Sequence, residues 1–293
     1  MYDKRAKQDA LDLWFSMPGE MSVDDFAAEL GYPSGSTLRN WIKADPRHDP
    51  DKCQYRSKPV LPKLEAIRRV AEGATAAQAA RETGRTGADI TLVGASKMND
   101  AAACQEAIAA GIDALGENRV QEMTAKLAED AYRGAPLHFI GHLQRNKVKQ
   151  VVGKVALIRS IGSPELLAEV DKQAEKLGIV QDILLEVNIG GEAAKSGFAP
   201  QEVENAAAQA KEMDHVRVRG LMTIPPADAT REENVVYFQK VQALYVDINR
   251  KMYDNELEYL SMGMSGDFAD AIRAGANMVR VGTAIFGARD YSK

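Results

Sequence analysis

The chain has 293 residues, of which 45% are apolar and 27% are charged, a composition typical of a globular protein with a sizeable core and unlike that of a disordered chain. Its formal net charge of −5 and its isoelectric point near 5.6 exclude a general electrostatic attraction to nucleic acid or anionic membranes, although a local basic patch stays compatible with them. The length is about that of one (β/α)₈ barrel with a small appendage.

The few cysteines and histidines predict a protein of the reducing cytosol without a metal site. Cys53 and Cys104 are too few for a disulfide framework. The chain does not begin with the apolar run of a signal peptide, and no window is long and apolar enough to span a membrane. His138 and His142 are four residues apart, but Gly141 interrupts the run and no third ligand is evident. We therefore expect a cytoplasmic protein with no metal and no membrane contact.

Residues 1–60 are predicted to form a small all-α segment of the helix-turn-helix type. A capping box at residues 22–25 opens a helix that ends at Gly31, and a second short helix turns Leu38 and Ile42 inward. An earlier apolar face consists of Leu11, Trp14 and Phe15, and the outward side chains of the second helix are Thr37, Arg39, Asn40 and Lys43. This pattern resembles the helix-turn-helix segments of transposase-type DNA-binding proteins.

The charge of this region predicts a contact with DNA through residues 22–43. Residues 31–63 hold seven Lys and Arg against three Asp, a net of +4, and such a stretch is typical of phosphate-backbone contacts. The alternative is a helical pair that only docks on the rest of the chain or on a partner. Four prolines between residues 45 and 62 indicate a linker. We therefore divide the chain into a segment of residues 1–60 and a barrel domain of residues 61–293.

Two further helical pieces follow the linker, over residues 63–72 and 76–83. Gly73 and Gly84 end them. They are compatible with a second helix-turn-helix and with helices that precede and plug a barrel, and the sequence favours neither.

From residue 89 onward, short apolar β-rich runs alternate with amphipathic helical stretches. We count eight runs, which favours a closed parallel (β/α)₈ TIM barrel over a doubly wound sheet, since the latter more often stops at five or six strands. The predicted strands are 90–95, 112–115, 137–140, 155–161, 183–188, 216–222, 257–262 and 278–281, and the predicted helices include 100–110, 120–132, 164–177, 200–213 and 232–252.

Residues at the carboxyl ends of these strands carry the chemistry of such a barrel. Alternation places Val93, Ala95 and Lys97 on one face, so Lys97 projects into the mouth, where a lysine can react with an aldehyde. A solvated lysine is the plain alternative. Ser265-Gly266 and Gly282-Thr283 offer hydroxyls and backbone N–H groups to an anion, or simply cap helices. An aldehyde at one end and a phosphate at the other describe pyridoxal 5′-phosphate (PLP).

Several blocks between about residue 84 and the end of the chain carry a specific resemblance. They are Val93–Lys97, Gly116–Glu122, His138–Lys147, Ser196–Gly197, Arg219–Met222, Ser261–Asp267 and Val279–Arg289. Together they closely resemble the pyridoxal phosphate homeostasis protein family. The resemblance implies a barrel of the alanine racemase N-domain type that holds PLP as an internal aldimine on Lys97.

The same resemblance implies the other residues that bind the cofactor, and it implies no catalytic residue. Ser265, Gly282 and Thr283 match the phosphate-binding positions, Arg280 matches the arginine near the pyridine nitrogen, and Asn118 and Asn188 fall near the cofactor. Two departures from the family pattern are Met98-Asn-Asp100, where Thr-Lys-Pro is common, and Arg119, where an aromatic residue is frequent.

These residues favour a PLP carrier without strong catalytic activity. Arg280 would disfavour protonation of the pyridine nitrogen and so weaken the electron sink that racemisation needs. The chain ends twelve residues after Val281, which leaves no room for the domain that supplies the second base in alanine racemases. We expect a role in intracellular PLP and amino/keto acid homeostasis, with PLP-dependent apo-enzymes as partners. The alternatives are a PLP-dependent amino acid racemase or lyase, and a PLP-responsive DNA-binding regulator.

Overall fold

The structure, a computed structural model, describes Leu11, Leu38, Ile42, residues 79–192 and residues 195–287. The chain divides into two compact units, residues 1–65 and 66–293. In the first unit the three described residues are helical and buried, as the apolar faces of the predicted helices require. The predicted helix-turn-helix and its DNA contact through residues 22–43 otherwise lie outside the described residues and stay predictions.

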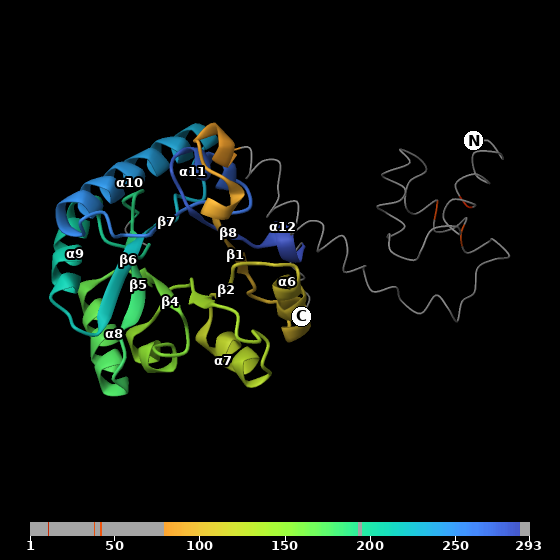
Figure 1. Cartoon of the computed structure of the whole chain (residues 1–293), viewed down its shortest axis with the longest axis horizontal. Helices are drawn as coiled ribbons and strands as arrows, with labels where there is room; N and C mark the ends of the chain where they lie inside the picture. The colour runs from red at the N-terminus through yellow and green to blue at the C-terminus, as the bar shows by residue number, and fades with distance from the viewer. Residues whose placement is uncertain (1–10, 12–37, 39–41, 43–78, 193–194, 288–293) are drawn as a thin grey trace. The chain divides into compact units, whose positions relative to one another are not determined.

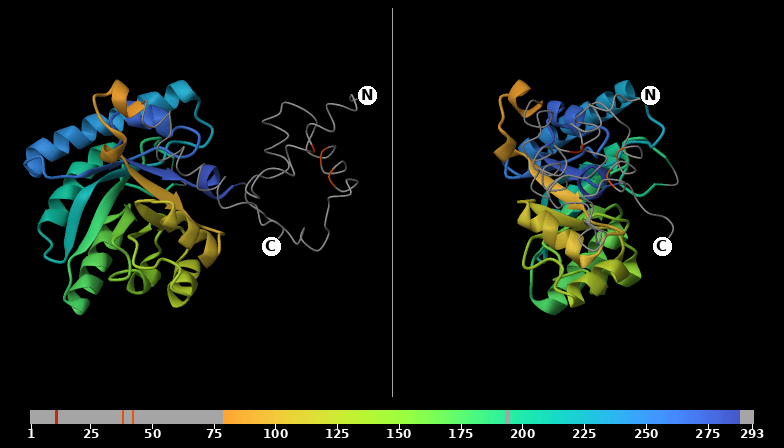
Figure 2. Two further views of the ribbon diagram at one scale, coloured as in Figure 1. Left: turned by 45° about the vertical axis from the view of Figure 1, so that its right-hand side comes forward. Right: turned by 90° about the vertical axis from the view of Figure 1, so that its right-hand side faces the viewer.

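The second unit contains a closed barrel of eight parallel strands, hydrogen-bonded to one another in sequence order (Figure 1). Pairing of the first strand with the last closes the barrel, and in Figure 2 the yellow-orange strand lies beside the blue one. The strands are β1 (Thr91–Ala95), β2 (Ala114–Glu117), β3 (Leu137–Phe139), β4 (Leu157–Ile161), β5 (Gln181–Val187), β6 (Val216–Thr223), β7 (Tyr259–Ser261) and β8 (Met278–Val281). The predicted (β/α)₈ barrel is confirmed.

Helices surround this barrel, and local capping fixes where several of them begin (Figure 1). The Asp100 carboxylate accepts the Ala103 N–H at the start of α6, and Ser163 caps α8 with Pro164 at its first position. The helices are α6 (Ala101–Ala109), α7 (Val120–Ala128), α8 (Pro164–Leu177), α9 (Val203–Lys211), α10 (Arg231–Met252), α11 (Phe268–Arg273) and α12 (Thr283–Phe286), with 3₁₀ turns η1 (Gly87–Asp89), η2 (Arg145–Gln150) and η3 (Pro200–Glu202). No helix in the described part of the chain is both long and apolar enough to cross a bilayer.

Alternation along the strands separates two apolar layers. Leu92 and Leu115 point outward and pack with the helices in the larger core. Val93 belongs to a smaller cluster inside the barrel with residues from five other strands, namely Ala114, Leu157, Leu184, Met222 and Met278. The inward side chains of the strands are therefore apolar in this cluster and polar nearer the carboxyl ends of the strands.

The end of the predicted helix over residues 76–83 packs on the barrel. Ala79 and Ala80 are buried in the outer core. Arg85 Nη1 donates to the carbonyl of Ala276 at 2.8 Å, and Arg273 Nε lies 2.7 Å from a carboxylate oxygen of Glu82. These contacts favour a helix that leads into the barrel over a second helix-turn-helix.

Several strand ends differ from their predicted positions by one or two residues, and β2 is displaced as a whole. β2 covers residues 114–117, where the sequence predicted 112–115. Asp113 lies just before the strand, and its carboxylate accepts the Leu92 N–H at 2.7 Å. Glu117 belongs to the strand because its backbone pairs with Phe139 of β3, and its buried carboxylate is paired with Lys126. A charged residue at a strand end is therefore part of the sheet here.

Candidate functional site

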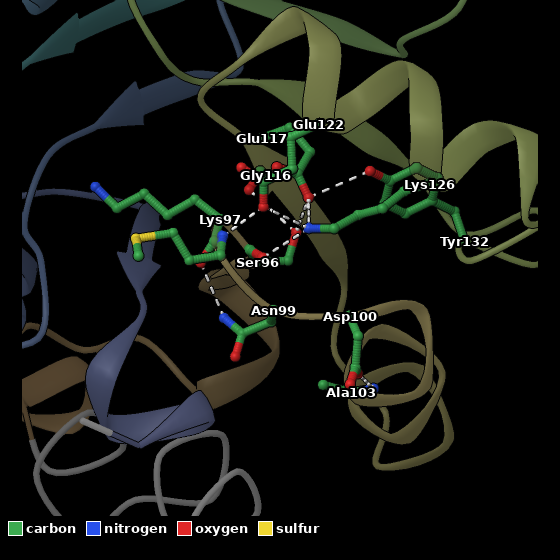
Figure 3. A network of polar contacts seen from close by, with 11 residues as sticks. Ser96, Lys97, Asn99, Asp100, Ala103, Gly116, Glu117, Glu122, Lys126 and Tyr132 are labelled. Carbon is green, nitrogen blue, oxygen red and sulfur yellow. Dashed lines mark hydrogen bonds and ion pairs between the residues drawn. The ribbon is translucent and has the colours of Figure 1, made fainter. Parts of the chain in front are cut away.

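Lys97 lies two residues beyond the end of β1, at the carboxyl end of the barrel. Val93 on the same strand is inside the barrel, so alternation directs Ala95 and Lys97 to the inner side. The side chain of Lys97 is half-buried. Figure 3 shows it extending away from the network of Glu117 and Lys126, toward the faint blue ribbon.

Arg280 on β8 reaches into the barrel from the strand that pairs with β1. Its guanidinium donates to the Thr223 carbonyl at 2.8 Å and to Ser261 Oγ at 3.0 Å, while Nε finds no acceptor among the described residues. Burial lowers the pKa of Arg280 to about 10. The group therefore stays positively charged at neutral pH.

The loops after β7 and β8 meet at the same end of the barrel. Gly282 N–H donates to Ser265 Oγ at 3.2 Å, and exposed Thr283 begins α12. A Cβ placed on Gly282 would lie 3.6 Å from the Cβ of Ala95. The Ser265–Gly282 contact thus lies beside the strand that carries Lys97.

The two predicted asparagines have different surroundings. Asn118 follows β2, and its buried Oδ1 has no hydrogen-bond donor within the described ranges. The loop after β3 approaches it so closely that a Cβ on Gly141 would lie 2.2 Å from the Asn118 carbonyl oxygen, so glycine is required there. Asn188 after β5 donates to the carbonyl of Glu192 at 2.9 Å. Its amide organises its own loop.

Inside the barrel the structure brings together charged residues that the sequence analysis did not select. Arg159 on β4 is fully buried, and its Nη2 donates to the same Ser261 Oγ that accepts from Arg280. Desolvation and the Arg280 charge lower the pKa of Arg159. Burial, with a smaller contribution from Arg159, lowers the pKa of His138 to about 3 and keeps it neutral. Burial raises the pKa of Glu186. The sequence signal that could have identified these residues was their position on the inward face of the predicted strands.

Outside the sheet, a second missed group lies between β2 and α7. Glu117 Oε1 lies 2.6 Å from Lys126 Nζ and accepts hydrogen bonds from Ser96 Oγ at 2.6 Å and Tyr132 OH at 3.2 Å (Figure 3). Glu117 and Ser96 are fully buried. Both residues lie in sequence blocks that carry the family resemblance, and this was the sequence signal that could have identified them.

No group of three or more residues able to hold a metal ion occurs among residues 79–192 and 195–287. The polar groups at the mouth are an amine, two hydroxyls, a guanidinium and backbone amides. Their chemistry suits an organic anion that carries a carbonyl group.

Comparison with known proteins identifies relatives of this barrel. The family described as alanine racemase, N-terminal domain, matches residues 78–290. A pyridoxal phosphate homeostasis protein of Aquifex aeolicus is 44% identical over 200 residues, which cover 68% of this chain and 87% of that protein. The structure of PipY from Synechococcus elongatus with PLP bound has a TM-score of 0.65 and 31% identity, covering 76% of this chain and all of that one. An alanine racemase of Clostridium difficile, 17% identical with a TM-score of 0.58, covers 80% of this chain and 57% of its own, and supports the fold alone.

Proposed function

The chain belongs to the pyridoxal phosphate homeostasis protein family, within the alanine racemase N-terminal domain family, and on this basis we propose that it binds PLP at the barrel mouth and acts in PLP and amino/keto acid homeostasis. When bound, PLP supplies an aldehyde carbon that condenses with a primary amine with loss of one water. The observation that carries the proposal is the position of Lys97 beside the Ser265–Gly282 contact at one end of the barrel.

Each residue of the mouth has a role in this proposal. Lys97 provides the amine, while Ser265, Gly282 and Thr283 bind the phosphate through hydroxyls and a backbone N–H. Arg280, whose guanidinium is held by Thr223 and Ser261 on the inner side of the barrel, would lie near the ring. Asn118 lies near the cofactor and has an Oδ1 to which a donor can bind, and we place Asn188 in the loop that borders the site.

The chemistry of Arg280 supports holding PLP over turning over amino acids. A charged guanidinium near the pyridine nitrogen would disfavour protonation of that nitrogen, and an unprotonated ring would withdraw fewer electrons from a bound substrate. His138 is neutral and buried, which removes it as an acid at neutral pH. The acceptors of released PLP would be PLP-dependent apo-enzymes. Exchange of the α-proton of alanine in D₂O at an enzymatic rate would instead favour the racemase alternative.

Spectroscopy of the purified protein with added PLP tests this assignment. The wild type should show a visible absorbance band, and borohydride reduction should attach PLP to the peptide that contains Lys97, as mass spectrometry can locate. Lys97→Ala should abolish both signals. Lys195→Ala is the matched control, since Lys195 is another half-buried lysine in a loop that follows a barrel strand. An unchanged band in Lys97→Ala, or an adduct on another lysine, would contradict the proposal.

A further inference from the structure

The backbone on both sides of Lys97 is hydrogen-bonded to side chains of one helix, α7. Lys126 Nζ donates to the carbonyl of Ser96 at 2.8 Å. The N–H of Met98 donates to the carboxylate of Glu122. Ser96 precedes Lys97 and Met98 follows it, so both peptide groups that flank the lysine are held from the same side.

We propose that Glu122 and Lys126, the α7 clamp, are positioning residues that fix the backbone of Lys97 so that its amine is presented to the barrel mouth. This inference rests on the proposed function for the role of the amine. The clamp itself consists of contacts that exist without any ligand.

A partly buried ion pair joins the two arms of the clamp, and a fully buried carboxylate, that of Glu117, pairs with the same ammonium. Lys126 Nζ lies 3.0 Å from Glu122 and 2.6 Å from Glu117 Oε1. The side chain of Lys126 is 7% exposed and that of Glu117 is fully buried, so these interactions are screened little by solvent. Ser96 Oγ also donates to Glu117 at 2.6 Å. Displacing one arm therefore disturbs the other.

The backbone of Met98 shows what the clamp must hold. Its φ is +61°, in the left-handed region that a residue with a Cβ adopts rarely and at a cost in free energy. The hydrogen bond from its N–H to Glu122 offsets part of that cost. Without Glu122 the turn after Lys97 would relax toward ordinary conformations, and the lysine would sample more orientations.

A held backbone matters for an amine that must meet an aldehyde bound by other groups. The Ser265–Gly282 contact comes from the far side of the β1–β8 seam. Condensation requires Nζ to reach a carbon fixed by that contact, and preorganisation lowers the entropy lost in doing so. Figure 3 shows the clamp and the Lys97 side chain on opposite sides of the backbone, so the clamp leaves the mouth open.

Hydrogen exchange of the full-length protein without PLP tests the clamp directly. In Glu122→Ala, the Met98 amide should exchange about tenfold faster than in the wild type, because a hydrogen bond to a charged acceptor is lost. Glu122→Gln keeps an oxygen that accepts the N–H and should stay within about twofold of the wild type. Glu122 is 20% exposed, so both variants should fold.

Glu233→Ala is the matched control. Glu233 stands at the third position of α10, as Glu122 does in α7, and its carboxylate also accepts a backbone N–H, that of Thr230, at 2.7 Å. This variant should speed exchange near Thr230 and leave Met98 unchanged. Equal acceleration of Met98 exchange in Glu233→Ala would overturn the clamp, because the effect would then be a general loss of helix capping.

PLP titration followed by visible absorbance tests the consequence. We expect an apparent affinity about tenfold weaker in Glu122→Ala, and within about twofold of the wild type in Glu122→Gln and Glu233→Ala. Wild-type exchange at Met98 or wild-type PLP affinity in Glu122→Ala would overturn the inference. If the wild type forms no adduct on Lys97, the proposed function fails, while faster Met98 exchange in Glu122→Ala would still support the clamp on the Lys97 backbone.

Discussion

The barrel wall separates two buried charged clusters that differ in how completely their charges are paired. The outer cluster lies between the sheet and α7 and consists of Ser96, Glu117, Lys126 and Tyr132. All three hydrogens of the Lys126 ammonium have acceptors, in Ser96, Glu117 and Glu122. Its one cation is therefore fully paired without a ligand, and Glu117 Oε2 is the side-chain atom of this cluster that has no hydrogen-bond partner among the described residues.

The inner cluster lies inside the barrel and consists of His138, Arg159, Ser261 and Arg280. Two guanidiniums share one hydroxyl, that of Ser261. Nitrogens of both arginines, together with His138 Nδ1, have no partner in the described part of the chain. Burial lowers the pKa of Arg280, and the charges of Asp267 and Glu186 offset only part of this shift. No described carboxylate forms an ion pair with either guanidinium, and buried cations without such a pair destabilise a fold. The outer cluster therefore stabilises the fold by itself, whereas the inner cluster keeps guanidinium N–H groups to which an anion can bind.

The largest expected effect is the loss of the outer ion pair in Lys126→Met. The substitution leaves the Glu117 carboxylate buried without its cation, which should lower the free energy of unfolding by about 3–5 kcal/mol. Urea unfolding at neutral pH without PLP measures it. Lys251→Met, at an exposed pair with Asp247 on α10, should change stability by less than about 0.5 kcal/mol. A loss of less than about 1 kcal/mol in Lys126→Met would show that the outer cluster is not structural.

His138 should give the inner cluster a distinctive pH dependence. Burial lowers its pKa to about 3 in the folded protein, while the unfolded chain takes up the proton near pH 6.5. The stability contributed by neutral His138 is therefore complete above about pH 6.5 and is lost as the pH falls toward 3. At about pH 4.5 the loss should reach roughly 2.7 kcal/mol.

The variant His138→Gln isolates this contribution. The difference in unfolding free energy between the wild type and the variant should shift by roughly 2.7 kcal/mol between neutral pH and about pH 4.5, in favour of the variant. Denaturant unfolding at the two pH values measures the shift. A difference that does not vary with pH would mean that His138 is protonated, or solvated, in the folded protein.

Arg159→Met should act with the opposite sign to Lys126→Met. It removes a fully buried cation with two unpaired nitrogens, so the protein without PLP should be unchanged or more stable, by up to about 2 kcal/mol. Urea unfolding under the same conditions measures the change. Destabilisation as large as that in Lys126→Met would abolish the distinction between the two clusters.

The sequence predicted the barrel from eight apolar runs that alternate with helical stretches, and it predicted the end that carries the mouth from the rule that such barrels place their chemistry at the carboxyl ends of the strands. Period-two alternation along the first strand added which side chains point inward. Val93 is inside the barrel as that pattern required. The pattern of apolar runs ended the predicted strand before Glu117, and it placed Arg159 within a predicted strand without showing that its charge is buried. Their partners are defined only by the fold, as Lys126 is nine residues from Glu117 and Ser261 is 102 from Arg159. Buried charge is therefore the part of this site that depends most on tertiary contacts.

The smallest predicted effect tests whether the outer cluster is as redundant as its geometry indicates. Tyr132→Phe removes the hydroxyl that donates to Glu117 at 3.2 Å, while Lys126 and Ser96 still bind the same oxygen at 2.6 Å each. Urea unfolding should show a loss of about 1 kcal/mol. Tyr253→Phe, whose hydroxyl donates to a backbone carbonyl outside the cluster, should lose a similar amount. A loss of about 3 kcal/mol or more in Tyr132→Phe alone would mean that the Glu117 charge depends on all three donors, and the contrast with the incomplete inner cluster would then be one of degree.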